Sequence, residues 1–545
     1  FYTEELWRGK AAWESCRRAL EAKGIDFEWA HYFPAPVPEG ENIFAVPKMK
    51  EWFVGRGATE LSKKAVAYPG LAVPTNGQYS RLEVAYITIE LPTGPARAST
   101  NVLRWDDPNA RAQALRLIKE VVGPIGFHPG SSGQLLFTPR SLDDIHPAQI
   151  TLQCQSAPTT NDLSHFLPQV GEIADTTAAQ SLEIEPQDQG YRAMMRAPDS
   201  AETFLKWSEQ FEPEFTLIHE AVQRPYVRMP GEYDVPENVS IPNFVSARAF
   251  VQLLSAESDC HLLQTNPGAA LMDLTLVNDL CRIFTNRPIT LVGSMINVAV
   301  RNLYAGDIAH GLRWHAWREP QLAALEEQLK NINVIAAVHE SLHMEPVAGC
   351  ENLQTIPTVR LFKLSFQDVN AWEKFKVRCE ARLMPCGWIY QNMIVTAQRA
   401  AEVDAWMYPI DQAVFPQQVE TDTTSMTNLL STGRPYTFLA AAFIPNFKKA
   451  VQRTALTQTK VRHAMIACAL ERYQLAHGDY PETLDALVPQ FIESIPNDVI
   501  GGKPPHYRRS GAGTYVLYSI GWSGQDGGGV SKPNDTGDWI WPEPD

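Results

Sequence analysis

The feature that most constrains this 545-residue sequence is the order of patterns near its C-terminal end. An apolar stripe, typical of one side of a helix, recurs every four residues at Val461, Met465, Ala469 and Tyr473. Gly478 should end that helix, because glycine readily adopts the left-handed backbone that closes helices. Pro481 suits the first turn of a second, short helix. The sequence therefore predicts a long helix, a sharp stop and a short helix.

Two strand-like segments follow this helical region. Residues 505–510 (PHYRRS) and 514–521 (TYVLYSIG) are joined by a glycine-rich connection at 511–513. The terminal segment, 521–541, is polar, rich in glycine and aspartate, and closed by tryptophans. The patterns predict a long helix followed by a small antiparallel sheet.

This region resembles a known family. The matching segments are 470–481 (LERYQLAHGDYP), 497–509 (NDVIGGKPPHYRR), 515–529 (YVLYSIGWSGQDGGG) and 534–539 (NDTGDW). In that order and at similar spacing, they resemble the soluble domain of the major pseudopilin of type II secretion systems. The rest of the chain loosely resembles uncharacterised bacterial envelope proteins with pseudopilin-like ends. The resemblance implies a structural protein rather than an enzyme.

The same resemblance implies a calcium ion in the C-terminal loop. Asp535 and Asp538 fall where the family has its late aspartates. Ser523 stands where the family has an aspartate, and Asp526 is expected to compensate for it. Calcium takes six to eight oxygen ligands, so the loss of one carboxylate weakens a site without abolishing it. The alternative is a loop without an ion, held by its closing tryptophans.

The length of the chain predicts three or four domains, and its pattern predicts an α+β multidomain protein. Residues 1–60 are expected to form an N-terminal helix and a Pro-rich linker, and residues 61–240 a mixed α+β domain. Helical hairpins, repeat-like but without a strict period, are expected over 241–440. The pseudopilin-like domain is expected over 441–545.

The N-terminal segment predicts a helix over residues 3–23 that ends at Gly24, with one side formed by Trp13, Cys16 and Leu20. Phe1 and Glu5 imitate the start of a mature pilin, but residues 6–10 are too polar for a membrane helix. We interpret that match as a coincidence. We expect a hydrophobic anchor or signal segment upstream of Phe1.

Several elements are expected between these ends. Strands are predicted at 81–91, 134–139, 149–154 and 358–366, and a helix from Asp107 to Val122. Four helices are predicted after Pro242, Pro267, Pro288 and Pro320, the last of them running through residue 343. A polar Thr/Ser-rich stretch at 420–433 is expected to precede the C-terminal domain.

The sharpest chemical motif is an HExxH at 339–343. On a helix, His339 and His343 lie on one face, as a zinc site requires, and Glu340 takes the place of a general base. Glu373 is the candidate for a distant third ligand, and Pro346 is expected to end the helix directly after the motif. The simpler interpretation is a surface-facing helix end without catalytic zinc.

The remaining histidines and cysteines give weaker evidence for a metal or catalytic site. His310 and His315 lie near two tryptophans in residues 310–320 and are expected to pack a helix corner. The eight cysteines form no CxxC pair. Cys260, Cys281 and Cys468 are expected to be buried, and pairing of Cys379 with Cys386 stays open.

The net charge of −15 argues against a nucleic-acid partner. The sequence thus predicts a non-catalytic structural or assembly protein of the bacterial cell envelope, on its periplasmic or extracellular face and held by an upstream membrane anchor. Its partners are expected to be other envelope proteins or further copies of itself. Two alternatives stay open, a zinc-dependent hydrolase using residues 339–343 and a helical-repeat module that binds proteins.

Overall fold

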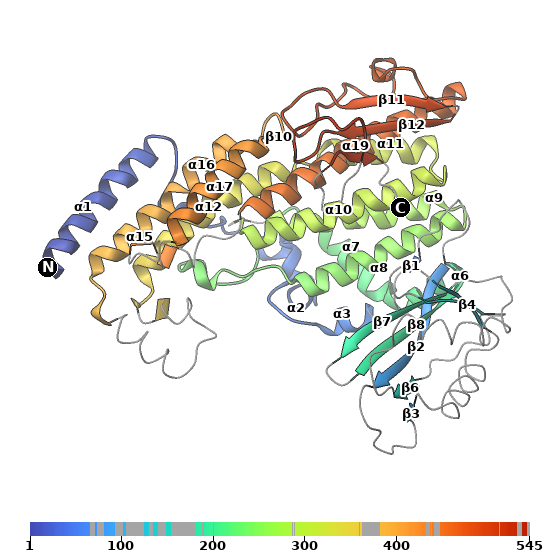
Figure 1. Cartoon of the computed structure of the whole chain (residues 1–545), viewed down its shortest axis with the longest axis horizontal. Coiled ribbons are helices and arrows are strands. Elements are labelled where there is room, and N and C mark those ends of the chain that lie inside the picture. The colour runs from blue at the N-terminus through green and yellow to red at the C-terminus, as the bar shows by residue number, and fades with distance from the viewer. Residues whose placement is uncertain are drawn as a thin grey trace. The chain divides into compact units, whose positions relative to one another are not determined.

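The computed structural model contains helices and strands in the N-terminal, middle and C-terminal parts of the chain (Figure 1). The described residues are 1–65, 71–72, 81–92, 102–104, 125–129, 135–139, 149–153, 180–187, 190–199, 201–285, 287, 289–358, 360–361, 382–431, 436–437, 439–440, 447–511, 513–530 and 537–541. Between residues 71 and 199 the structure describes the strands of the backbone and how they pair.

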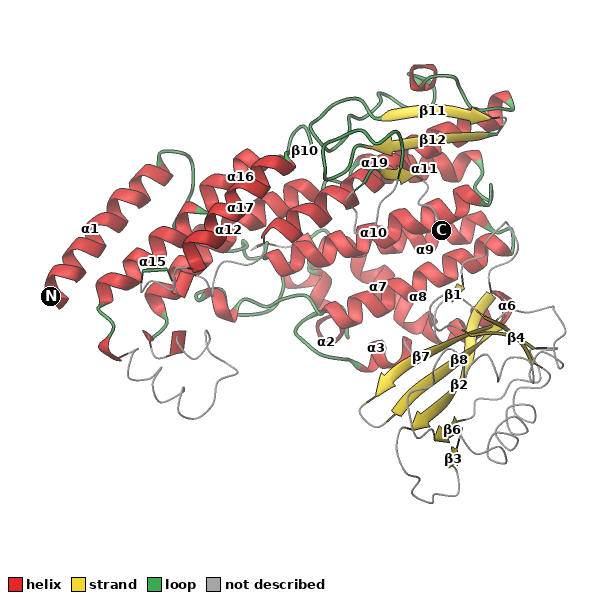
Figure 2. Cartoon of the chain, viewed as in Figure 1, coloured by secondary structure: helices red, strands yellow, loops and turns green. Residues whose placement is uncertain are grey.

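The chain divides into two compact units. Unit 1 consists of residues 1–62, 212–258 and 267–545, and unit 2 of residues 63–211 and 259–266. The chain is mostly helical, with a small antiparallel sheet of three strands near its C-terminus (Figure 2). This agrees with the α+β class expected from the sequence. The finer division at residues 60, 240 and 440 stays a prediction.

Unit 2 contains an eight-stranded sheet in the order β3-β6-β2-β8-β7-β5-β4, with β1 paired to β2. Strand β2 pairs antiparallel with β8 and parallel with β6. The strands are β1 (Leu71–Ala72), β2 (Arg81–Pro92), β3 (Val102–Arg104), β4 (Ile125–Pro129), β5 (Leu135–Pro139), β6 (Gln149–Gln153), β7 (Gln180–Gln187) and β8 (Gly190–Asp199). The three strands predicted in this region correspond to β2, β5 and β6 and are confirmed. The helix expected from Asp107 to Val122 lies outside the described residues.

Most of the described helices belong to unit 1. They are α1 (Tyr2–Glu21), α2 (Met49–Phe53), α7 (Glu212–Val222), α9 (Pro267–Leu280), α10 (Leu291–Arg313), α11 (Glu319–Lys330), α12 (Val334–Thr355), α15 (Cys386–Gln398), α16 (Ala400–Trp406), α17 (Pro416–Ser431) and α19 (Phe447–His477). Helix α8 (Phe244–Leu263) begins in unit 1. A short hairpin of β9 (Met407–Tyr408) and β10 (Ala413–Val414) follows α16.

Helix α19 is the central helix of unit 1. It packs against α10, α11, α12 and α17. Residues 454–459 and 466–471 are buried without interruption, so all sides of the helix are covered over these two stretches, whereas Arg453 is exposed. The apolar stripe predicted along one side is therefore only part of a larger buried surface. Gly478, with a φ of 86°, ends the helix as predicted.

A buried glutamine of α19 joins it to the turn between α11 and α12. The Gln458 side chain accepts a hydrogen bond from the backbone N–H of Val334 at 2.9 Å and donates one to the carbonyl of Ile332 at 3.0 Å. Asn333 caps the start of α12 by accepting from the N–H of Ala336. Two helices, α11 and α12, therefore occupy this stretch. The prediction of a single helix from Pro320 through residue 343 is wrong.

The C-terminal sheet has the order β11-β12-β13 and is antiparallel throughout. Its strands are β11 (His506–Gly511), β12 (Thr514–Ser519) and β13 (Trp539–Trp541). The first two were predicted. Strands β12 and β13 both pack against α19. The short helix expected at Pro481 is a 3-10 turn at Leu484–Leu487, so this proline lies before its first residue.

Helix α1 was predicted, including its buried side with Trp13 and Leu20. It crosses α15 where Gly9 meets Gly387, and a Cβ at Gly387 would overlap the backbone carbonyl of Glu5. The buried Glu5 carboxylate accepts a hydrogen bond from the Trp388 indole N–H at 3.0 Å.

One further prediction between 351 and 440 is wrong where the structure describes it. The described residues of the strand expected at 358–366, which are 358 and 360–361, are helical. Most of the polar stretch at 420–433 forms α17. There, the hydroxyls of Thr421, Thr424, Ser425 and Thr427 donate to the carbonyl four residues earlier, which satisfies them within the helix.

The three cysteines predicted to be buried, Cys260, Cys281 and Cys468, are buried. Cys386 is exposed and free, whereas Cys379 lies outside the described residues. Among the described helices, none has both the length and the apolar character needed to cross a bilayer.

Candidate functional site

The HExxH motif lies within α12 rather than at its end. Helix α12 continues through the buried Pro346 to Thr355. The prediction that this proline ends the helix is therefore wrong. Proline lacks the N–H that would bond four residues back, but the surrounding core supports the helix across this position. His339 and His343 are thus held on a long, well-packed helix.

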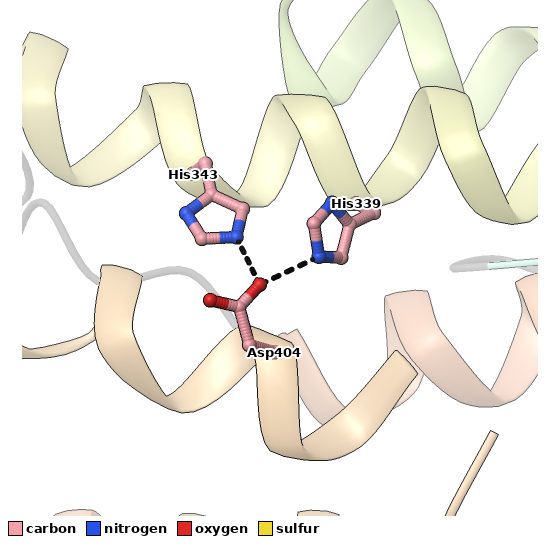
Figure 3. A group of neighbouring side chains, drawn as sticks. All are labelled: His339, His343 and Asp404. Atoms are coloured by element: carbon pink, nitrogen blue, oxygen red, sulfur yellow. Dashed lines mark hydrogen bonds and ion pairs between the residues drawn. The ribbon is translucent and has the colours of Figure 1, made fainter. Parts of the chain in front are cut away.

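A third side chain meets the two histidines. Nε2 of His339 and Nε2 of His343 each lie 2.9 Å from Oδ1 of Asp404, and the two imidazole centroids are 4.5 Å apart (Figure 3). The fully buried residues Val403 and Trp406 hold α16 against the core and α12. This packing places Asp404 opposite the histidine face of α12. Three ligand-type atoms therefore converge at one point.

The electrostatic environment favours a neutral imidazole beside a charged carboxylate. Burial lowers the pKa of His339, and the neighbouring His343 lowers it further, against the opposing effect of Asp404. Partial burial works to raise the pKa of Asp404, but hydrogen bonds and electrostatic attraction from the two imidazoles outweigh it and hold that pKa below its usual range. Neutral imidazole and ionised carboxylate are the forms that bind metal ions.

Glu340 is directed elsewhere. Its carboxylate forms an ion pair with Arg287 at 2.9 Å. It lines a separate pocket of about 210 Å³ together with Asp26, His31, Tyr32, Arg287, Ile289 and Met344. In a catalytic HExxH site this glutamate faces the metal-bound water. Here its carboxylate is paired with Arg287 instead.

The sequence did not identify Asp404. Glu373, the third ligand that we expected, lies outside the described residues. Asp404 is 61 positions beyond His343 and has no motif around it that marks a ligand. In the aromatic cluster near residue 314, the rings of His310 and Trp314 stack at 5.8 Å as predicted, whereas the His315 imidazole lies 2.7 Å from the Glu471 carboxylate.

The predicted calcium loop has a different arrangement. The carboxylate of Asp538 is buried and accepts hydrogen bonds from the backbone N–H groups of Gly527, Gly529 and Val530 at 3.1, 2.7 and 3.1 Å. These amides surround the carboxylate oxygens that a calcium ion would need. The loop is thus closed around Asp538 by its own backbone.

The other two described candidates do not complete a calcium site. Asp526 accepts from the Tyr518 hydroxyl and from the N–H of Gly528, and the Ser523 hydroxyl lies 3.4 Å from two backbone carbonyls. The described residues therefore do not fit the ion. Asp535 lies outside the described residues, so calcium binding by the complete loop stays a prediction.

Comparisons of the chain with protein-family models, with curated proteins and with solved structures find no match.

Proposed function

We propose that this chain is a non-catalytic structural and assembly protein of the bacterial cell envelope, with a pseudopilin-like module at its C-terminal end. The proposal rests on the sequence resemblance of residues 470–539 to the major pseudopilin. The described architecture of this end, a long helix followed by a three-stranded antiparallel sheet, is compatible with it.

The burial of α19 is the observation that carries the structural role. In this chain α10, α11, α12 and α17 cover the helix that begins the module. A helix covered by its own chain is not available to pack against the same helix in other copies. The module therefore works as a fixed part of a larger body, and we propose that its exposed surface contacts other envelope proteins.

The non-catalytic role is supported by the pairing of Glu340 with Arg287, which leaves the HExxH motif without its general base. A membrane anchor outside residues 1–545 would hold this body at the periplasmic or extracellular face. Self-association is the second proposed mode of assembly.

Cell fractionation tests this proposal. The full-length gene product that contains residues 1–545, expressed with an epitope tag in the bacterium that encodes it, should be recovered with the envelope and should cross-link to envelope proteins. Recovery in the cytosolic fraction alone, with no envelope cross-links, would contradict the proposal.

A groove favours a second candidate function, the binding of a partner protein. Helices α8, α10 and α19 line a groove of about 550 Å³, with apolar residues that include Phe244, Met295 and Leu303. The cationic residues Arg248, Arg453 and Lys460 also line it. This combination suits an acidic amphipathic helix of a partner, because such a helix presents an apolar face and carboxylates together.

A charge reversal tests that candidate. Arg248→Glu should weaken binding of acidic amphipathic peptides at least tenfold, whereas Lys10→Glu, an exposed change on α1, should leave binding unchanged. Equal binding by both variants would remove the groove from consideration.

A further inference from the structure

We propose that His339, His343 and Asp404 form a binding site for one divalent transition-metal ion of the zinc type, which joins α12 to α16. This site lies apart from the pseudopilin-like module and is independent of the envelope function proposed above. Its evidence is the convergence of the three side chains (Figure 3).

The distances fit an ion after a small expansion. All three ligand atoms lie within 4.8 Å of one another, and each histidine Nε2 is 2.9 Å from Oδ1 of Asp404. In tetrahedral zinc sites, metal–ligand bonds of about 2.0–2.1 Å place neighbouring ligand atoms about 3.3 Å apart. Each imidazole nitrogen therefore needs to move about 0.4 Å away from the carboxylate, and the separation of the two nitrogens, at most 4.8 Å here, needs to adjust to the same spacing.

The ligand types select the metal class. Two imidazoles and one carboxylate suit zinc and related transition metals, whereas calcium and magnesium prefer oxygen ligands alone. The histidine side chains are mostly buried, at 18% and 20% exposed, while Asp404 is 61% exposed. The ion is thus approached from the Asp404 side, where solvent supplies the remaining ligand.

The role of the ion follows from the elements that it joins. His339 and His343 belong to α12, and Asp404 belongs to the short helix α16, so the bound metal crosslinks two helices far apart in sequence. Because Glu340 is paired with Arg287, the metal-bound water lacks the adjacent base that hydrolysis requires. We therefore assign the ion a structural role.

Metal titration of the full chain tests the site. Protein stripped with a chelator and then given Zn²⁺ should hold one zinc per chain by elemental analysis. With Co²⁺ it should show the intense visible absorption of four-coordinate cobalt. His343→Ala should abolish stoichiometric binding, and Asp404→Asn should weaken it at least tenfold. Because Asp404 is largely exposed, the second variant should keep its fold in chelator, as circular dichroism would show.

Two matched variants serve as controls. Glu340→Gln should keep full zinc binding, because Glu340 is not a ligand. His31→Ala removes an exposed histidine that pairs with a single aspartate, Asp26, and should also keep it. Zinc well below one per chain in the wild type would overturn the proposal. Equal zinc loss in His31→Ala and His343→Ala would do the same, because it would show that surface histidines bind the metal.

Discussion

The loop closed around Asp538 makes a sharp prediction. Replacing Asp538 by Asn keeps the size of the side chain but replaces one acceptor oxygen by an NH₂ group. Oδ2 accepts from Gly529 and Val530, and Oδ1 accepts from Gly527. Whichever way the new amide is turned, at least one of these three N–H groups loses its acceptor. Asp538→Asn should therefore open the loop more readily.

The size of the effect follows from the kind of bond lost. A hydrogen bond to a buried charged group contributes about 1.5–3 kcal/mol. Since about 1.4 kcal/mol corresponds to a tenfold change, the amides of residues 527–530 should exchange with deuterium roughly 10 to 150 times faster in the variant. Hydrogen-exchange mass spectrometry of the full chain measures this directly.

A calcium comparison completes the experiment. If backbone amides hold the loop, wild-type protection at residues 527–530 should be the same in millimolar calcium and in chelator. Asp526→Asn is the matched control, and because Asp526 is half exposed, its effect should be much smaller. Wild-type protection that disappears in chelator would refute the reasoning and restore the calcium site that the pseudopilin resemblance implies.

Other positions give independent predictions. Gly387→Ala should displace α1 and cost roughly 1–3 kcal/mol by overpacking, seen as faster exchange in α1, whereas Gly40→Ala, which adds its methyl group into open space, should not. His463 is fully buried, and its burial, reinforced by Arg462, lowers its pKa from 6.5 to about 3. The unfolded chain therefore takes up the proton first, so the stability from this group is present above about pH 6.5 and is lost as pH falls toward 3. At pH 5 the loss in the free energy of unfolding should be about 2 kcal/mol. The melting temperature of His463→Gln should therefore fall less between pH 7.5 and 5 than that of the wild type. An unchanged decline in that variant would contradict the burial of a neutral histidine.

Elements with strong local signals were predicted from the sequence. Helix α1 has a regular apolar side, β2 alternates, and Gly478 marks a helix end by its own backbone preference. Local rules also identified β11 and β12. In each case the pattern and the surrounding structure favour the same conformation.

The failures occur where distant contacts determine the structure. The core around α12 carries the helix through Pro346, although proline is usually a helix end. Asp404 joins His343 only through the packing of α16 on α12, which local sequence patterns do not reveal.

The most direct test of the account concerns α19. If this helix is the core of unit 1, its amides over residues 454–471 should be among the slowest to exchange in the full chain. A fragment of residues 445–545 should lose this protection and show no cooperative melting transition, because its buried surface has lost α10, α11 and α12. A fragment that melts cooperatively, with α19 protected as in the full chain, would contradict the account and show an independent pilin-like domain.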